Sequence, residues 1–199
     1  GDIGALVVKL PLPPGTFTTL WNARERYLNA YFSRYPGYYE TGDAGYIDDN
    51  GYVFVMARTD DVINVAGHRL STGAMEEVLA EHPDVAECAV VGVADAMKGQ
   101  LPLGLLVLNA GVTRSAEEVV AESIQHMRDK IGPVAAFKLC AVVERLPKTR
   151  SGKILRGTMR AIADGDAWKM PATIDDPVIL EEVTVALRSL GYAGQVPRS

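Results

Sequence analysis

The sequence predicts an α+β protein, in which the end of a β-rich segment is followed by a small two-layer domain with the element order αββαβ. Two observations support this prediction. Apolar residues alternate as in strands up to about residue 57, and helical periods alternate with short apolar runs after about residue 72. The polar stretch 58–72 lies between these regions and indicates a hinge. We therefore expect three parts: 1–59 as the end of a larger β-rich domain, 60–165 as a mobile α+β domain, and 166–199 as a tail with a helix.

Three elements are expected before the hinge. They are a strand over residues 3–10, a short helix within 16–32 that places Leu28, Tyr31 and Phe32 on one face, and a hairpin over 46–56. The hairpin should turn at Asn50-Gly51, because this dipeptide accepts positive φ at both turn centres. Gly1 is not a start methionine and runs directly into a strand, so we expect the C-terminal part of a longer protein.

After the hinge, apolar periodicity predicts a helix over 72–81 and strands at 85–93, 103–108 and 139–143. The first helix should bury Met75, Val78 and Leu79. A second helix should begin at Ser115, which forms a capping box with Glu118, and end at Gly132-Pro133. Its buried face is expected to hold Val120, Ile124, Met127 and Ile131. A last helix should follow Asp176 as its cap, with Pro177 at its first position and a stripe of Ile179, Val183, Ala186, Leu187 and Leu190.

Composition is that of a globular cytoplasmic protein. The chain has 199 residues, a net charge of -5, 48% hydrophobic residues and no apolar run long enough to span a bilayer, so no membrane association is expected. Cys88 and Cys140 lie in apolar surroundings and are expected to be reduced thiols. The three histidines lack the spacing of a zinc site, so we expect no metal ligands.

Two polar windows are candidates for binding an anion. The first, 58–72, holds an Asp pair beside Arg58, then Gly67 and Arg69, which are ingredients of a phosphate- or ribose-binding turn. The alternative is a solvated hairpin followed by a helix cap at Ser71 or Thr72. The second, 145–163, has six basic residues and no acidic one, and carries the tip Ser151-Gly152-Lys153. Its alternative is a solvated basic loop.

Four motifs together resemble the late motifs of the acyl-adenylate-forming enzymes. They are Tyr39-Glu40-Thr41-Gly42-Asp43, Arg58-Thr59-Asp60-Asp61, Gly67-His68-Arg69 and Pro147 to Arg156. Within that superfamily the sequence is most similar to acetyl- and propionyl-CoA synthetases. Residues 60–72, 131–137 and 172–177 resemble the propionyl-CoA synthetases most. The resemblance implies that the full-length enzyme activates a short carboxylic acid with ATP, giving acyl-AMP and pyrophosphate, and then transfers the acyl group to coenzyme A. The implied cofactors are ATP, coenzyme A and the Mg²⁺ that accompanies ATP.

The resemblance also implies residue roles. Lys153 would be the catalytic lysine of adenylation, and acetylation by a protein acetyltransferase, reversed by a deacetylase, would switch it off. The other implied roles are the ribose for Asp43 and Arg58, the nucleotide phosphate for Arg69, the hinge for Asp60, the pantetheine tunnel for the backbone of Ala66 and Gly67, and a coenzyme A phosphate for Arg128. Family members often carry serine where this chain has Ala66.

Other interpretations stay open from the residues alone. Asp43 could cap a turn, Asp60 could form an Asx-turn, and Arg69 and Arg128 could be exposed surface arginines. The protein could instead be an adenylation domain that loads a carrier protein, or a non-catalytic nucleotide-binding relative. The acidic total and the lack of interleaved aromatic residues argue against nucleic acid as a partner. The phosphate-binding loop and acyl pocket of such enzymes are absent from these residues, so the fragment alone should fold but not catalyse.

Overall fold

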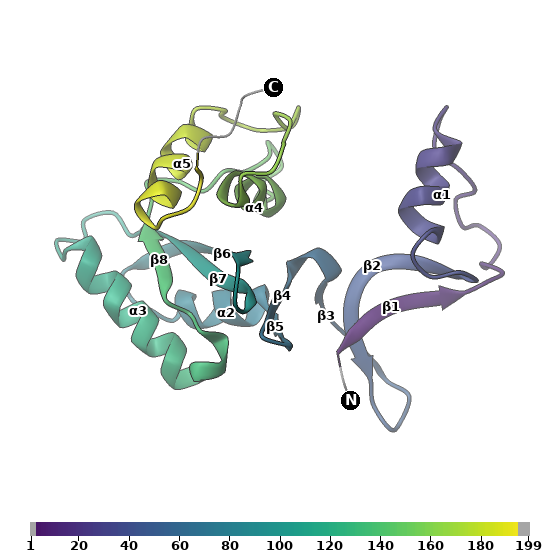
Figure 1. Cartoon of the computed structure of the whole chain (residues 1–199), viewed down its shortest axis with the longest axis horizontal. Helices are drawn as coiled ribbons and strands as arrows, with labels where there is room; N and C mark the ends of the chain where they lie inside the picture. The colour runs from purple at the N-terminus through teal and green to yellow at the C-terminus, as the bar shows by residue number, and fades with distance from the viewer. Residues whose placement is uncertain (1–2, 195–199) are drawn as a thin grey trace. The chain divides into compact units, whose positions relative to one another are not determined.

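The computed structural model describes residues 3–194. The chain divides into two compact units, Gly1–Asp60 and Asp61–Ser199. The first unit is a three-stranded antiparallel sheet of order β1-β2-β3 with one helix (Figure 1). Its elements are β1 (Gly4–Lys9), α1 (Arg24–Phe32), β2 (Tyr38–Ile47) and β3 (Val53–Arg58), followed by a 3-10 turn (Thr59–Asp61). The predicted strand, helix and hairpin are all present.

Aromatic contacts hold α1 on the sheet. Tyr27 is buried and meets Phe17 edge to face, and Tyr31 stacks on Tyr39 of β2 with ring centroids 5.3 Å apart. The predicted face of α1 is therefore partly wrong. Tyr27, and not the predicted Leu28, is buried, because the helix packs through its aromatic rings; Leu28 is 43% exposed.

The hairpin between β2 and β3 turns differently from the prediction. Gly51 has a φ of 84°, but Asn50 is not in the positive region. The reason is Asp48, whose Oδ1 accepts the N–H groups of Asn50 at 3.0 Å and Tyr52 at 2.8 Å. This side chain closes a longer loop in which only one residue needs positive φ.

The second unit is built on a five-stranded sheet. Four strands have the order β5-β4-β7-β6, and β8 pairs in parallel with β7. The elements are β4 (Val62–Val65), β5 (His68–Ser71), α2 (Thr72–Ala80), β6 (Val85–Asp95), β7 (Gly99–Leu108), α3 (Ala116–Lys130), a 3-10 turn (Pro133–Ala135), β8 (Leu139–Val142), α4 (Arg156–Asp164) and α5 (Ile179–Ser189). The α+β class is confirmed. The order αββαβ omitted the hairpin β4–β5 and helix α4.

Helices cover both faces of this sheet, so the unit has three layers rather than the predicted two (Figure 1). Successive residues of β6 and β7 face opposite sides, so each strand serves both cores. The core with α4 and α5 contains Val91, Leu103, Met159, Ile162, Val183 and Leu187. The core with α2 and α3 contains Val90, Leu106, Met75, Leu79, Val119 and Met127. The third layer consists of α4, which the predicted order omitted, and of α5, which belongs to the segment expected as a tail.

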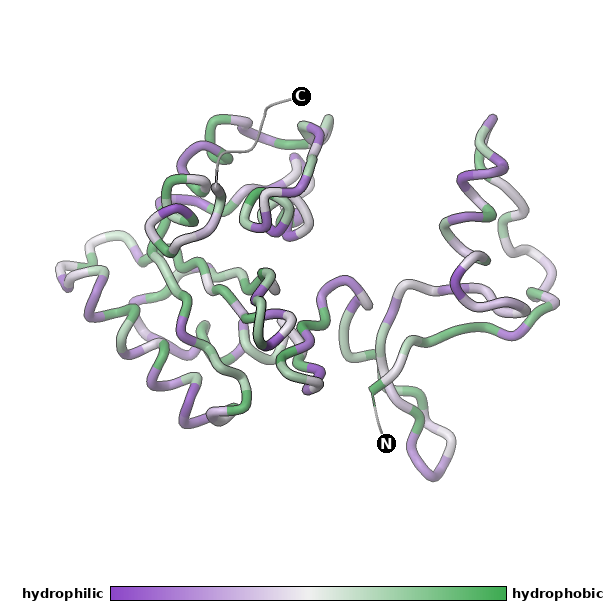
Figure 2. Tube along the Cα trace, in the orientation of Figure 1, coloured by the Kyte–Doolittle hydropathy of each residue, from purple (hydrophilic) through white to green (hydrophobic). Residues whose placement is uncertain are grey.

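Local sequence determines how the helices begin. Ser71 caps α2, since its Oγ accepts the N–H of Ala74, and Ser115 and Glu118 form the predicted capping box of α3. The predicted start of α5 is wrong: Asp176 accepts the N–H of Val178, but the helix begins at Ile179 with Val178 as its N-cap and no side-chain cap, so Pro177 lies before the helix. Figure 2 shows hydrophilic and hydrophobic residues alternating along α3. The fully buried residues of α3 are Val119, Ser123 and Met127. Of the predicted face, Met127 is buried, whereas Val120, Ile124 and Ile131 are only partly buried at its margin.

Both cysteines are free thiols in apolar surroundings, as predicted. Burial raises the pKa of Cys140 to about 12 and that of Cys88 to about 11. Between residues 3 and 194, no helix is both long and apolar enough to cross a membrane.

Candidate functional site

An acid–base pair joins neighbouring strands of the first unit. Asp43 of β2 lies opposite Arg58 of β3, and Arg58 Nη1 is 3.5 Å from Asp43 Oδ1. Arg58 Nε is also 3.4 Å from Oδ1 of Asp60. The Asp43 side chain is 37% exposed, so its carboxylate still has lone pairs accessible to a ligand. The structure thus brings Asp43, Arg58 and Asp60 together.

Gly42 makes room for that guanidinium. Its φ is +79°, and a Cβ atom there would lie 2.8 Å from both terminal nitrogens of Arg58. Thr59 Oγ1 donates to the carbonyl of Gly42 at 3.2 Å, and the Asp43 N–H donates to Thr41 Oγ1 at 3.1 Å. Each residue of Thr41-Gly42-Asp43 therefore has a structural task in presenting the carboxylate.

Ala66 and Gly67 are the two central residues of the β4–β5 hairpin turn. Both have positive φ, 49° and 91°, as a two-residue I′ turn requires. The Ala66 N–H donates to the carbonyl of Lys98 at 2.8 Å, and the Gly67 N–H donates to Asn64 Oδ1 at 3.0 Å. Asn64 is held in turn by Gln100, whose Oε1 accepts its N–H at 2.8 Å. The β6–β7 hairpin therefore fixes this turn.

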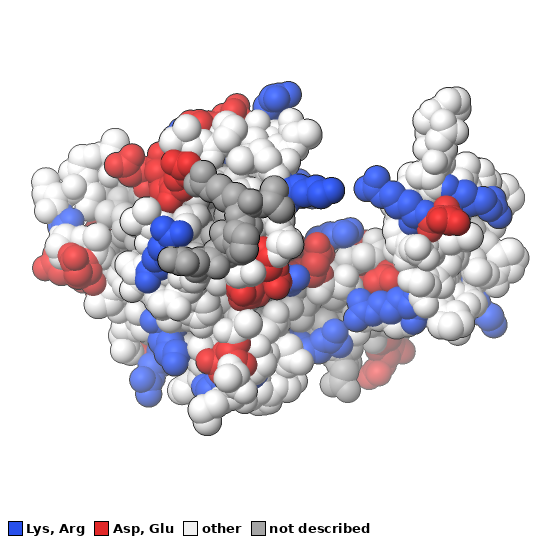
Figure 3. All heavy atoms as spheres, turned by 45° about the horizontal axis from the view of Figure 1, so that its top comes forward, with Lys and Arg blue, Asp and Glu red and all other residues white. Residues whose placement is uncertain are grey.

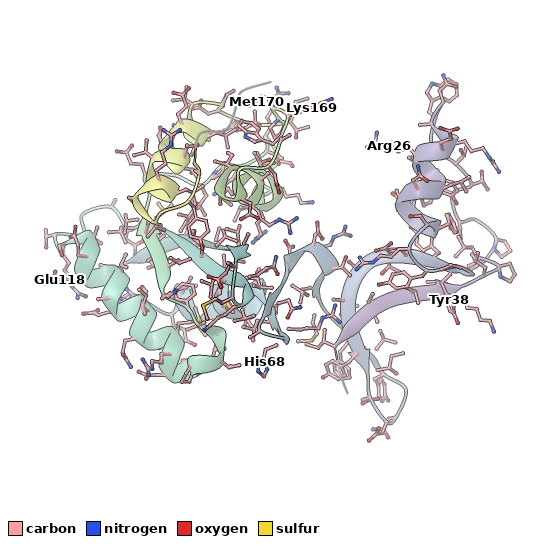
Figure 4. The ribbon with its side chains drawn as sticks, in the orientation of Figure 1. Arg26, Tyr38, His68, Glu118, Lys169 and Met170 are labelled. Carbon is pink, nitrogen blue, oxygen red and sulfur yellow. The ribbon has the colours of Figure 1, made fainter. Side chains whose placement is uncertain are left out.

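The surface beside the turn is open. A Cβ atom on Gly67 would meet nothing within 4 Å. His68 and Arg69 follow on β5 and are exposed, and Figure 4 shows His68 extending away from the ribbon. Arg128 is also exposed, in the last turn of α3, and no hydrogen bond joins it to the turn among the described residues.

The basic segment is a small hydrogen-bonded hairpin whose tip, residues 150–153, is exposed to solvent. Lys148 pairs with Ile154, the Thr149 N–H donates to the Lys153 carbonyl at 2.8 Å, and Gly152 at the tip has a φ of 83°. The Lys153 N–H also donates to Thr149 Oγ1 at 3.1 Å. The backbone on both sides of Lys153 is therefore fixed.

Carboxylates pair with three of the six basic side chains in residues 145–163. Arg145 contacts Asp176 and Glu182, Lys148 Nζ lies 2.7 Å from Glu87, and Arg156 binds Glu76 at 2.8 Å. On the face shown in Figure 3, basic side chains lie among acidic ones. Lys153 is exposed and has no carboxylate within ion-pair distance among residues 3–194. Its ammonium is therefore available to an external anion.

A second polar cluster, which the sequence did not indicate, surrounds His82. His82 Nε2 is 3.1 Å from Glu122 Oε2, and Arg114 contacts both Glu122 and Asp84. A pocket of about 310 Å³ adjoins it, lined by Glu81, His82, Pro83, Glu122, Gln125, His126 and Asp129. In the described part of the chain, no group of three or more His, Cys, Asp or Glu side chains is arranged to hold a metal ion.

Comparisons of the sequence with known proteins show what the chain is similar to. The AMP-binding enzyme C-terminal domain matches residues 74–153. Human acyl-CoA synthetase short-chain family member 3, mitochondrial, is 52% identical over 94% of this chain and 27% of its own length. Acetyl-coenzyme A synthetase of Pyrobaculum arsenaticum is 44% identical over 96% of the chain and 28% of its length.

Solved structures agree. An anthranilate CoA ligase in complex with anthranoyl-AMP superposes with a TM-score of 0.67 at 28% identity, covering 82% of this chain and 30% of that one. The amide bond synthetase McbA of Marinactinospora thermotolerans gives 0.62 at 30% identity, covering 81% and 31%. The chain spans less than a third of the length of these relatives. It contains an AMP-binding enzyme C-terminal domain, and over nearly its whole length it is homologous to part of the short-chain acyl-CoA synthetases.

Proposed function

We propose that this chain is the C-terminal part of an ATP-dependent short-chain acyl-CoA synthetase. The enzyme would join a small carboxylic acid to AMP with release of pyrophosphate, and then transfer the acyl group to the thiol of coenzyme A. The main support is Lys153, an unpaired ammonium on a backbone that hydrogen bonds hold on both sides. The names of the homologous enzymes point to the same reaction.

Adenylation needs a positive charge where two anions meet. A carboxylate oxygen attacks the α-phosphorus of ATP, the bond to the β-phosphate oxygen breaks, and pyrophosphate leaves. Lys153 would bind the acid and the α-phosphate, and so offset the negative charge that builds up as they approach. Three of its basic neighbours are less suited, because Arg145, Lys148 and Arg156 are already paired with carboxylates.

Asp43 and Arg58 would bind the ribose of the nucleotide. A carboxylate accepts hydrogen bonds from two ribose hydroxyls, and the arginine donates to the same sugar. Their 3.5 Å contact orients both groups before a nucleotide binds. Arg69, exposed on β5, would bind the nucleotide phosphate. Mg²⁺ would accompany the ATP phosphates.

Thioester formation would use a different surface of the second unit. Asp60 lies at the boundary between the two units and would be the pivot of their rotation. The backbone of Ala66 and Gly67 would line the path of the pantetheine arm, where the open space beside Gly67 suits close approach of a thin ligand. Arg128, exposed on α3, would bind a coenzyme A phosphate.

Propionate is the proposed substrate and acetate the second choice, because the sequences of residues 60–72, 131–137 and 172–177 resemble those of propionyl-CoA synthetases most. The residues that measure acyl length are not among those described here. The exposed Lys153 amine would also be accessible to a protein acetyltransferase and a deacetylase, and acetylation would remove its charge. Two free thiols agree with a reducing, cytoplasmic location.

The test compares Lys153→Ala with Lys148→Ala in the full-length enzyme. Lys153→Ala should lower propionate-dependent ATP–pyrophosphate exchange by about 10²–10³, the usual cost of one preorganised charge donor. Thioester formation from supplied propionyl-AMP should persist, because the second unit has then rotated. Lys148→Ala should have a modest, salt-sensitive effect.

Two results would contradict the proposal. One is equal adenylation by the two lysine variants, and the other is equal loss of both half-reactions in Lys153→Ala. Exchange with acetate run beside propionate ranks the two acids. Transfer of the acyl group to a carrier protein in place of coenzyme A would instead identify a carrier-loading enzyme.

A further inference from the structure

The segment that follows α4 contacts the lysine hairpin directly. Thr149 forms a bridge with Ile174, the Arg150 N–H donates to the Thr173 carbonyl at 2.9 Å, and the Asp175 N–H donates to the Lys148 carbonyl at 3.0 Å. Residues 173–175 thus lie alongside the hairpin that carries Lys153 and join it through one isolated β-bridge and two backbone hydrogen bonds. This segment lies outside residues 74–153, which match the AMP-binding enzyme C-terminal domain.

Asp176 ties this segment to the chain that enters the hairpin. Its Oδ2 accepts a hydrogen bond from Arg145 Nη1 at 2.7 Å, and its Oδ1 accepts the N–H of Val178 at 3.0 Å. Arg145 also donates through Nη2 to Glu182 of α5 at 2.9 Å. The Asp176 carboxylate therefore connects Arg145, just before the hairpin, with the start of α5, which follows residues 173–175.

The anchor behind this connection is rigid. Val183 and Leu187 of α5 are fully buried, and Ile174 is 5% exposed in the same core. The Asp176 side chain is 42% exposed, but it lies between the buried Ile174 and Ile179, and through its contact with Arg145 it connects this core to the start of the hairpin. Lys148, on the same arm of the hairpin that residues 173–175 contact, also pairs with Glu87 of β6.

We infer that Asp176 is a positioning residue for adenylation, and that residues 173–182 keep the Lys153 hairpin in its productive geometry. The inference rests on the proposed role of Lys153. A displacement of about 1 Å of a catalytic group can cost as much as 10²-fold in rate. Lys153 follows a flexible glycine at an exposed tip, so its placement depends on the strands beneath it.

The test is Asp176→Asn in the full-length enzyme. Asparagine is nearly isosteric and can still accept the Val178 N–H, but it removes the negative charge that Arg145 binds. Asp176→Glu serves as the conservative variant. Asp166→Asn is the matched control, since Asp166 is an exposed carboxylate just after α4 with no side-chain partner among the described residues.

Two readouts separate positioning from general destabilisation. Asp176→Asn should lower kcat of pyrophosphate exchange about 10-fold with little change in KM for ATP, while thioester formation from supplied acyl-AMP stays within about 2-fold. Hydrogen exchange should become faster at the amides of Thr149, Gly152 and Lys153, and not at those of β6 and β7. Asp176→Glu should recover part of the loss, and Asp166→Asn should match the wild type in both readouts.

Unchanged exchange at the hairpin amides, or equal loss of both half-reactions, would overturn the inference. The hydrogen-exchange readout does not depend on activity. If Lys153→Ala abolishes adenylation while Asp176→Asn does not affect it, the positioning role fails and the proposed function stands. If the wild-type enzyme shows no pyrophosphate exchange with any short acid, the proposed function fails.

Discussion

Glu76 of α2 binds the guanidinium of Arg156 with both of its carboxylate oxygens. Arg156 Nη2 lies 2.9 Å from Oε1 and 2.8 Å from Oε2, and Oε1 also accepts the N–H of Val90 at 2.8 Å. The two side chains are 18% and 25% exposed. Burial lowers the pKa of Arg156, but the hydrogen bonds and charge of Glu76 outweigh it, so the pKa is raised overall. This pair joins α2, β6 and the first residue of α4.

Removing one partner of this pair should destabilise the second unit strongly. Glu76→Gln leaves the Arg156 charge partly buried without its counterion, and we expect a loss of about 2–3 kcal/mol in the free energy of unfolding. Urea unfolding of the chain, followed by circular dichroism, measures it. Glu87→Gln is the control, because its pair with Lys148 is more exposed and should contribute no more than about 1 kcal/mol. Equal losses in the two variants would show that burial does not matter here.

Acid should destabilise the cluster around Glu122. Hydrogen bonds from Arg114 and then His82 lower the pKa of Glu122 below its ordinary value. A lowered pKa means that the stabilisation is complete above the pKa in the unfolded chain, about 4.3, and is lost as pH falls through the lower folded value. Glu122→Gln should therefore lower the urea midpoint at neutral pH and flatten its fall in acid. Urea titrations between about pH 7 and pH 3 test this.

The control for that experiment is Glu117→Gln. Glu117 lies in the first turn of the same helix and makes no ion pair among the described residues. Its variant should reproduce the pH profile of the wild type. A flattened profile in both variants would mean that net charge, and not the contacts of Glu122, sets the acid dependence.

Local signals allowed much of the fold to be predicted. The capping box at Ser115 and Glu118 and the Ser71 cap depend on neighbours in sequence, and both are confirmed. The hairpin β4–β5 was missed as part of the sheet because each strand has only four residues and three of the four in β5 are polar. Helix α4 was missed because its segment was interpreted by its charge, although Met159 and Ile162 are buried.

In the candidate site, too, contacts between residues far apart in sequence could not be predicted. The pairing of Asp43 with Arg58 follows from strand register, which a residue pattern does not specify. The pairings of Lys148 with Glu87 and Arg145 with Asp176 join residues far apart in sequence, so composition alone could not show that half of the basic side chains in this segment are paired with carboxylates. Which of the six basic residues are paired is therefore a structural finding.

Restricting Asp60 should separate the two half-reactions of the full-length enzyme. Proline fixes φ near about −65°, so Asp60→Pro should hold the boundary between the two units in one conformation. We expect one half-reaction to survive at least about 10-fold better than the other, in assays of pyrophosphate exchange and of thioester formation from acyl-AMP. Asp60→Ala is the control, since it removes the contact with Arg58 but leaves the backbone free. The same loss in both variants would assign the effect to the side chain and contradict a pivot.

Gly67 and Gly111 offer a matched pair for testing the thioester surface. Both have positive φ, 91° and 86°, and a Cβ atom on either would meet nothing within 4 Å. Alanine at each should therefore cost a similar amount of stability, about 1–2 kcal/mol, because L residues disfavour this region. Only Gly67 lies in the turn that is proposed to line the pantetheine path.

In the full-length enzyme, Gly67→Ala should lower thioester formation from supplied acyl-AMP at least about 10-fold, because its methyl group would project into the space that the pantetheine arm needs. Pyrophosphate exchange should change little, since adenylation does not use this turn. Gly111→Ala, in the loop between β7 and α3, should leave both half-reactions near the wild-type rates while losing the same stability. If the two variants form thioester equally well, the turn does not line the coenzyme A path. If Gly67→Ala loses adenylation as severely as thioester formation, the turn acts on the fold and not on one step.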